Sequence, residues 1–163
     1  MTAPAALSGD SQDSSGRYAV VVSRFNDEVT TGLLRGALAT LGESGVAAAR
    51  ITVIHVPGAY EIPLAARRAG SSGLFDAVIC LGCLIKGDTM HFEYIAEAAT
   101  HGIAWAAVAT GVPMTFGVLT TLTDEQALIR SRPGPENKGR EAALAAVEMV
   151  TLLRKFPAAG GAR

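Results

Sequence analysis

Four short apolar runs, rich in β-branched residues, alternate along the chain with segments in which apolar side chains recur every three or four residues. The runs predict buried strands at residues 17–23, 50–56, 76–82 and 114–121. The periodic segments predict helices near 27–42 and over 60–69, 90–110, 124–130 and 137–155. Regular alternation of strand and helix is typical of a parallel sheet with helices on both faces. We therefore expect an α/β fold, a single-domain three-layer αβα sandwich around a central four-stranded parallel sheet.

The length and composition fit one domain. The chain has 163 residues, of which 49% are apolar and 18% charged, which is enough for one core. We expect residues 17–156 to form the domain, with flexible tails at 1–16 and 157–163. The formal net charge of −1 gives no general attraction to nucleic acid or to an anionic membrane. With no cationic leader and no run long enough to span a membrane, the sequence predicts a cytoplasmic protein without nucleic-acid or membrane partners.

Cys80 and Cys83 form a C-x-x-C pattern, which in other settings is a redox pair or half of a zinc site. Residues three apart on a strand point to opposite faces of the sheet, so the two thiols are expected to diverge. No second cysteine pair or nearby histidine pair completes a ligand set. We therefore expect two core residues and no metal site.

Ligands of parallel sheets bind at the carboxyl ends of the strands, so the residues that follow each strand are the candidates. Phe25 follows the first strand, where it could stack on a planar ring or simply plug the end of the sheet. Pro57 and Gly58 predict a turn after the second strand. Glu61, in the helix behind that turn, could favour the helix dipole or accept hydrogen bonds from ligand hydroxyls.

The segment after the third strand is the most informative. Gly87, Asp88 and Thr89 lead directly into a predicted helix, and free backbone N–H groups at a helix start bind anions such as phosphate. Thr89 could add a hydroxyl to such a site or merely cap the helix. His91 falls in the first turn, where it could transfer protons near neutral pH or be an ordinary polar residue.

The end of the chain carries a basic segment and an apolar helix. Arg130 or Arg132 could hold a phosphate through the planar guanidinium group, or both could belong to a solvated basic loop. The last predicted helix is apolar around most of its circumference, so it requires burial on more than one side. We expect a neighbouring subunit to cover part of it.

Five segments occur in order along the chain: SRFN, PGAYEIP, LGCLIKGDTMHFEY, FGVLTT and NKGREAA. With these spacings, from about Arg17 to Phe156, the chain closely resembles the lumazine synthase family. The resemblance implies a transferase of riboflavin biosynthesis, which condenses 5-amino-6-(D-ribitylamino)uracil with 3,4-dihydroxy-2-butanone 4-phosphate. The products are 6,7-dimethyl-8-ribityllumazine, phosphate and water. No metal and no cofactor are implied.

The resemblance also implies roles for residues at the strand ends. Those matched to the pyrimidine substrate are Phe25, Ala59, Tyr60, Glu61, Cys83, Leu84 and Ile85. Among these, Phe25 matches the stacking aromatic, and Glu61 is suited to the ribityl hydroxyls. Asp88 and Thr89 match the phosphate-binding turn, and His91 matches the residue credited with proton transfer.

A neighbouring subunit of this family contributes to the same pocket. The matching residues are Phe116 for stacking, Arg130 for phosphate pairing and Lys138 as a support of the phosphate site. The loop before NKG contains Pro133 and Pro135, where the family is rich in Gly and Ala, so Arg132 competes with Arg130 for the phosphate role.

The resemblance implies a homo-oligomer, either a pentamer or a 60-subunit shell of twelve pentamers, with riboflavin synthase as a candidate partner. The loop before the last helix has no insertion, which favours the shell. Two other functions are open: a flavodoxin-like module that binds flavin or lumazine without turnover, and a shell-forming scaffold without activity. His91 beside a phosphate turn has no task in the first, and the complete set of pocket residues argues against the second.

Overall fold

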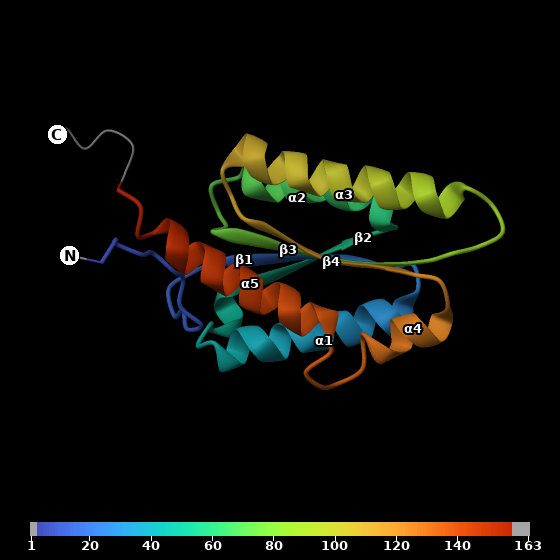
Figure 1. Ribbon diagram of the computed structural model, residues 1–163, viewed down its shortest axis with the longest axis horizontal. Helices are drawn as coiled ribbons and strands as arrows, with labels where there is room; N and C mark the ends of the chain where they lie inside the picture. Colours follow the sequence, from blue (N-terminus) through green and yellow to red (C-terminus); the bar gives the residue numbers. More distant parts are fainter. Residues whose placement is uncertain (1–2, 158–163) are drawn as a thin grey trace.

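The computed structural model describes residues 3–157 and contains the predicted alternation of strands and helices (Figure 1). The strands are β1 (Tyr18–Ser23), β2 (Ile51–Val56), β3 (Ala77–Ile85) and β4 (Met114–Thr121). The helices are α1 (Asp27–Glu43), α2 (Ile62–Gly70), α3 (His91–Thr110), α4 (Asp124–Ile129) and α5 (Lys138–Leu153). None of the described helices is long and apolar enough to cross a membrane.

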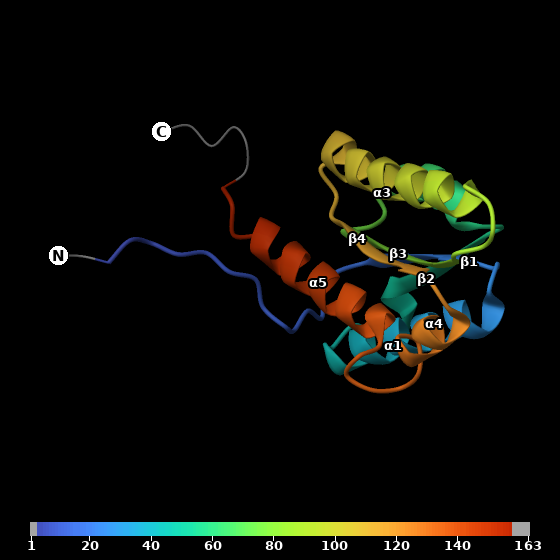
Figure 2. The ribbon, with the colours of Figure 1, turned by 45° about the vertical axis from the view of Figure 1, so that its right-hand side comes forward.

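The sheet is parallel throughout, with the strand order β2-β1-β3-β4. Helices α2 and α3 cover one face, and α1, α4 and α5 cover the other (Figures 1 and 2). This arrangement confirms the expected three-layer αβα fold, with the flavodoxin-like order of strands. The carboxyl ends of the strands lie at one end of the molecule, together with the starts of α1 and α3 (right in Figure 1).

The strand-forming runs split their side chains between two cores. Along β1, Tyr18, Val20 and Val22 pack in the core on the α1 and α5 side, whereas Ala19 and Val21 pack in the core on the α2 side. All of these side chains are almost fully buried. Because successive strand residues point to opposite faces, a strand buried on both faces needs the unbroken apolar run that the sequence shows.

The two cysteines point to opposite faces of the sheet, as their spacing on the strand predicted. Cys80 lies in the α2 and α3 core and Cys83 in the α1 and α5 core, on opposite faces of β3, and both are free thiols. Burial raises the pKa of Cys80 to about 12. Burial and the nearby Asp124 carboxylate raise the pKa of Cys83 to about 11. Both thiols are therefore protonated at neutral pH, as core residues rather than nucleophiles.

Two predicted boundaries were wrong. The third strand does not end at Gly82 but continues to Ile85, because Cys83–Ile85 still pair with Leu119–Thr121 of β4. The second helix does not begin at Tyr60: Ala59–Glu61 form a 3-10 turn, and α2 begins at Ile62 with Pro63 in its first turn. Proline has no N–H to donate, so it is tolerated only at that position of a helix.

Helix α5 is buried on two sides within the chain itself. It packs against α1 and against the neighbouring strands β3 and β4. Its sheet-facing residues, such as Ala143 and Val147, are fully buried, whereas Leu144, Met149 and Leu153 remain 37–40% exposed. The chain thus buries most of the apolar surface of α5 that we expected a neighbouring subunit to cover, and leaves these three side chains partly exposed.

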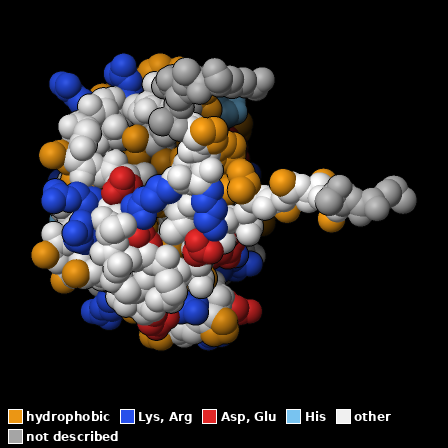
Figure 3. Space-filling model, turned by 90° about the vertical axis from the view of Figure 1, so that its left-hand side faces the viewer, with side chains coloured by type: hydrophobic (Ala, Val, Ile, Leu, Met, Phe, Trp, Pro, Cys, Tyr) orange, Lys and Arg blue, Asp and Glu red, His pale blue; other side chains and the backbone are white. Residues whose placement is uncertain are grey.

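Residues 3–17, which belong to a segment that we expected to be a flexible tail up to residue 16, contain no helix or strand but contact the rest of the domain closely. The Asp13 side chain is buried and accepts hydrogen bonds from the Tyr18 hydroxyl at 2.7 Å, from Arg154 at 2.9 Å and from the backbone N–H groups of Ser15 and Gly16. Burial alone would raise the pKa of the Asp13 carboxyl, but these donors outweigh it and hold that pKa well below its usual range. Figure 3 faces this end of the molecule, where basic and acidic side chains lie interspersed.

We expect Asp13→Asn to lower the free energy of unfolding at pH 7 by about 2 kcal/mol, because several donors lose a charged acceptor. The folded-state pKa of Asp13 is depressed, so its contribution is fully present at neutral pH and is lost as the pH falls below about 4. Urea unfolding at pH 7 and pH 3 should therefore show a large difference between wild type and variant at pH 7 and a smaller one at pH 3. Asp10→Asn, which removes an exposed pair with Lys155, is the control and should change little.

Candidate active site

The loop after β1 presents Phe25 at the carboxyl end of the sheet. Backbone hydrogen bonds anchor this loop to the end of β2: Arg24 N donates to Val56 O at 2.9 Å, and Phe25 N donates to Pro57 O at 3.2 Å. The Phe25 ring is 70% exposed, so it does not plug the end of the sheet. An aromatic ring held by a rigid loop and facing solvent is available for stacking on a planar ligand.

Asn26 is a residue whose main role the sequence did not reveal. It is the one non-glycine among residues 3–157 with a positive φ, 58°, a conformation that asparagine tolerates better than most residues. It stands at the N-cap position of α1, but its side chain makes no capping hydrogen bond in that helix. Instead its Nδ2 donates to the carbonyl of Cys83 at 2.9 Å and ties the Phe25 loop to β3. The sequence signal for such a role is only a polar residue directly after a strand.

The turn after β2 is held by its own glutamate. The Glu61 carboxylate accepts a hydrogen bond from the backbone N–H of Gly58 at 2.9 Å and closes the 3-10 turn. Ala59 is buried beneath this turn, whereas Tyr60 is 61% exposed. Glu61 is also exposed, so the same carboxylate that shapes the turn faces solvent where ligand hydroxyls would approach.

The strand-end residues of β3 differ in exposure. Cys83 is buried, and Leu84 and Ile85 are half-buried. The Cys83 carbonyl already accepts the Asn26 hydrogen bond, which leaves it one lone pair. This stretch pairs with β4, so its backbone contacts to a ring edge would have rigid support from that strand.

The predicted phosphate turn is open. Asp88 and Thr89 are exposed, and Met90 at the start of α3 supplies no side-chain cap. Thr89 accepts from the backbone N–H of His91 only at 3.5 Å, which is too long for a strong cap. The first backbone N–H groups of α3 therefore point to a site that a ligand anion can occupy. His91 is the first residue of the helix and is exposed beside this turn.

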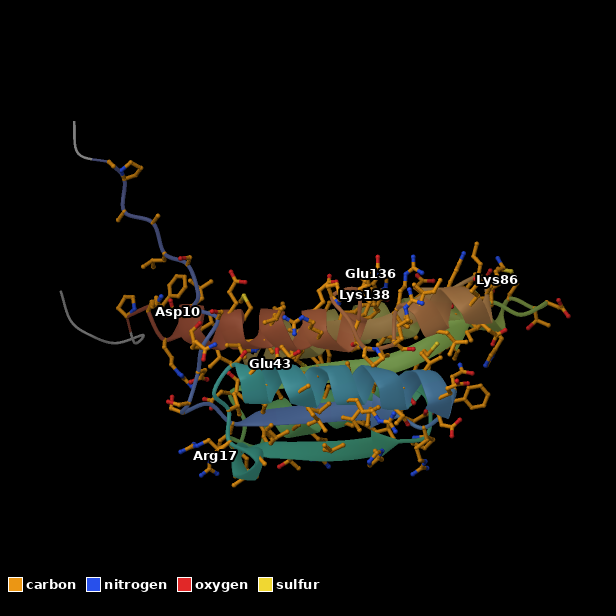
Figure 4. The ribbon with its side chains drawn as sticks, turned by 90° about the horizontal axis from the view of Figure 1, so that it is seen from below. Asp10, Arg17, Glu43, Lys86, Glu136 and Lys138 are labelled. Carbon is orange, nitrogen blue, oxygen red and sulfur yellow. The ribbon has the colours of Figure 1, made fainter. Side chains whose placement is uncertain are left out.

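Phe116, Arg130 and Lys138 form a second, separate group. They line one hollow along the outer edge of β4, and neither Phe25 nor His91 lines it. The backbone N–H of Lys138 donates to the Arg130 carbonyl at 2.9 Å, which holds the backbones of the two residues side by side. In Figure 4, Lys86 marks the carboxyl end of β3 at the right, and Lys138 lies nearer the middle of the molecule.

Arg132 does not belong to this second group. It lines a different groove, bounded by α1 and the loop over residues 130–137. Of the two arginines that competed for the phosphate role, only Arg130 is placed with Phe116 and Lys138.

Within one chain, then, the candidate residues form two half-sites. One is at the strand ends and offers a stacking ring, a carboxylate, an open helix start and an imidazole. The other is at the β4 edge and offers a ring and two cations. Together they have the groups for holding a planar ring and a phosphate and for moving protons.

Comparison with known proteins identifies the family of the chain. The sequence model of the family described as 6,7-dimethyl-8-ribityllumazine synthase matches residues 15–154. The chain is 52% identical over 140 residues to 6,7-dimethyl-8-ribityllumazine synthase 1 of Caulobacter vibrioides, covering 86% of this chain and 92% of the relative. It is 49% identical over 153 residues to 6,7-dimethyl-8-ribityllumazine synthase of Salinibacter ruber, covering 94% of this chain and 98% of the relative. The chain belongs to the lumazine synthase family.

Proposed function

We propose that this chain catalyses the condensation of 5-amino-6-(D-ribitylamino)uracil with 3,4-dihydroxy-2-butanone 4-phosphate to give 6,7-dimethyl-8-ribityllumazine, phosphate and water. The observation that carries the proposal is the family match over residues 15–154, which includes every residue of both half-sites. The reaction consists of imine formation, phosphate loss and ring closure. These steps need proton transfers, which His91 can supply, and the phosphate needs an anion site, which the open start of α3 can supply.

In this proposal the strand-end half-site binds the pyrimidine and carries the chemistry. Phe25 stacks on the ring, the Ala59–Glu61 turn receives the ribityl chain, and Cys83–Ile85 contact the ring edge through their backbone. Asp88 and Thr89 form the phosphate turn, and His91 moves the protons. The exposure of Phe25 and the open start of α3 support these roles.

We further propose that a second copy of the chain completes the site with Phe116, Arg130 and Lys138. The separation of the two half-sites within one chain supports this proposal. Arg130 and Lys138 line a hollow that His91 does not line, so a second copy of the chain would have to bring them to a phosphate at the start of α3. The assembly would be a pentamer or a 60-subunit shell of pentamers. Such a biosynthetic enzyme would work in the cytoplasm, with riboflavin synthase as a candidate partner.

The two proposals are tested together on one purified sample. Mixing the protein with both substrates should produce the fluorescence of the lumazine, and light scattering should give the mass of a pentamer or of a shell. Tight flavin binding without product formation would support a binding module instead. A large assembly that neither binds flavin nor forms product would support a scaffold.

Arg130→Ala should raise the KM for the phosphorylated ketone about tenfold, because a charge-assisted contact to phosphate is lost. The KM for the pyrimidine should change little. Arg132→Ala is the matched control, since Arg132 lines the other groove, and its two KM values should stay near those of the wild type. Steady-state kinetics with each substrate varied in turn measures both. The opposite result, an effect of Arg132→Ala alone, would move the phosphate role to Arg132.

A further inference from the structure

An ion pair spans the base of the turn that leads into α3. Lys86 Nζ lies 2.6 Å from Glu93 Oε1, with the side chains 47% and 33% exposed. Lys86 follows β3 and is fixed there, because its backbone N–H donates to the carbonyl of Thr121 on β4 at 2.9 Å. Glu93 lies in the first turn of α3. The pair therefore connects the rigid end of the sheet directly to the start of the helix.

The turn between the two charges has little else to hold it. Gly87 to His91 are exposed, and a Cβ added at Gly87 would meet no atom within 4 Å. The hydrogen bonds that close the turn are long: His91 N to Thr89 Oγ1 is 3.5 Å, and Tyr94 N to Met90 O is 3.3 Å. A loop without packing and with weak hydrogen bonds is the kind of segment that opens locally at low cost.

Lys86 and Glu93 are each other's charged partner. The hydrogen bond from Lys86 lowers the pKa of the Glu93 carboxyl, so Glu93 is ionised at neutral pH. Glu93 Oε2 is shielded from solvent and has no hydrogen-bond partner in the described part of the chain, so the carboxylate depends on Lys86 for its main stabilising contact. The Lys86 ammonium is correspondingly directed to Glu93.

We propose that Lys86 and Glu93 are positioning residues that hold the Gly87–Met90 turn in the conformation that binds the phosphate of the ketone substrate. The inference rests on the proposed function for the identity of that substrate. Neither residue touches the phosphate in this proposal. They act by fixing the two ends of the turn, so that the N–H groups at the α3 start stay directed to one point.

The direction in which two charge-removing substitutions change the phosphate affinity distinguishes positioning from simple electrostatics. If only charge matters, Lys86→Met removes a cation and weakens anion binding, whereas Glu93→Gln removes an anion and strengthens it. If the pair positions the turn, each substitution breaks the same contact and both weaken binding. The double variant should then be no worse than either single one, because the contact can be lost only once.

The experiment measures inorganic phosphate affinity by calorimetry and the KM of each substrate by the fluorescence assay, in wild type, Lys86→Met, Glu93→Gln and the double variant. We expect both single variants to weaken phosphate binding and raise the ketone KM about three- to fivefold, the scale of one exposed ion pair. The pyrimidine KM should stay within about twofold, a split that general loss of structure would not give. Glu43→Gln, which breaks the exposed Arg140–Glu43 pair across α1 and α5, is the control and should change neither KM.

Tighter phosphate binding by Glu93→Gln would overturn the proposal and make Lys86 a direct ligand that Glu93 restrains. Unchanged affinity in both single variants, or an equal rise in both KM values, would also overturn it. Failure of the proposed function has a different signature: the wild type would make no lumazine, while the phosphate affinities of the four proteins would still decide whether the pair positions the turn.

Discussion

Replacing His91 with alanine is expected to lower kcat about a hundredfold, the low end of what a lost general acid–base group costs. The imidazole lies at the first residue of α3, next to the open phosphate turn, where imine formation and phosphate loss both need a proton moved. It is exposed and contributes no packing to either core, so the fold should survive the change. The measurement is kcat from lumazine fluorescence, and added imidazole should restore part of the rate.

His101 gives the matched control for this prediction. It lies on the same helix, is well exposed and has only a 4.0 Å contact with Glu97. His101→Ala should therefore leave kcat close to that of the wild type. An unchanged kcat in His91→Ala would remove His91 from the mechanism, whereas an equal loss in both variants would point to the stability of α3.

The fold was predictable because its elements have strong local signals. An unbroken β-branched run such as residues 18–23 identifies a strand buried on both faces, and alternation with helices identifies a parallel sheet. The error at the end of β3 has a different cause. Gly82 suggests an end of the strand, but Cys83–Ile85 continue the apolar run and β4 pairs with them. The start of α2 has a local signal, because Pro63 disfavours a helix that begins as early as Tyr60.

The site was predictable in part, for the same reason. Parallel topology places the residues that follow β1, β2 and β3 at one end, so Phe25, Glu61 and His91 follow from the strands alone. The division into two half-sites does not, because Arg130 and Lys138 meet through a backbone hydrogen bond that closes the loop between them, beside the outer edge of β4. The Asn26 contact with Cys83, 57 residues away along the chain, is likewise a tertiary contact without a sequence signature.

Gly139→Ala is expected to lower the free energy of unfolding by at least about 3 kcal/mol. Gly139 lies in the first turn of α5, where the helix crosses α1 at backbone contact. A Cβ there would lie 2.7 Å from the carbonyl carbon of Leu33 and closer still to its oxygen. Those are backbone atoms of α1, which cannot rotate away as a side chain would. The two helices would have to separate, and the core between them, which includes Leu33, Ala143 and Val147, would loosen.

Gly42→Ala is the control, because we expect it to change the free energy of unfolding in the opposite direction. Gly42 lies in α1, but a Cβ there would meet no atom within 4 Å. The same substitution should therefore raise the free energy of unfolding by up to about 1 kcal/mol, because alanine favours the helix and restricts the unfolded chain. Urea unfolding followed by circular dichroism compares the variants, at one protein concentration because association would add to stability. If alanine at position 139 cost under 1 kcal/mol, α1 and α5 could not lie in direct backbone contact at Gly139 and Leu33.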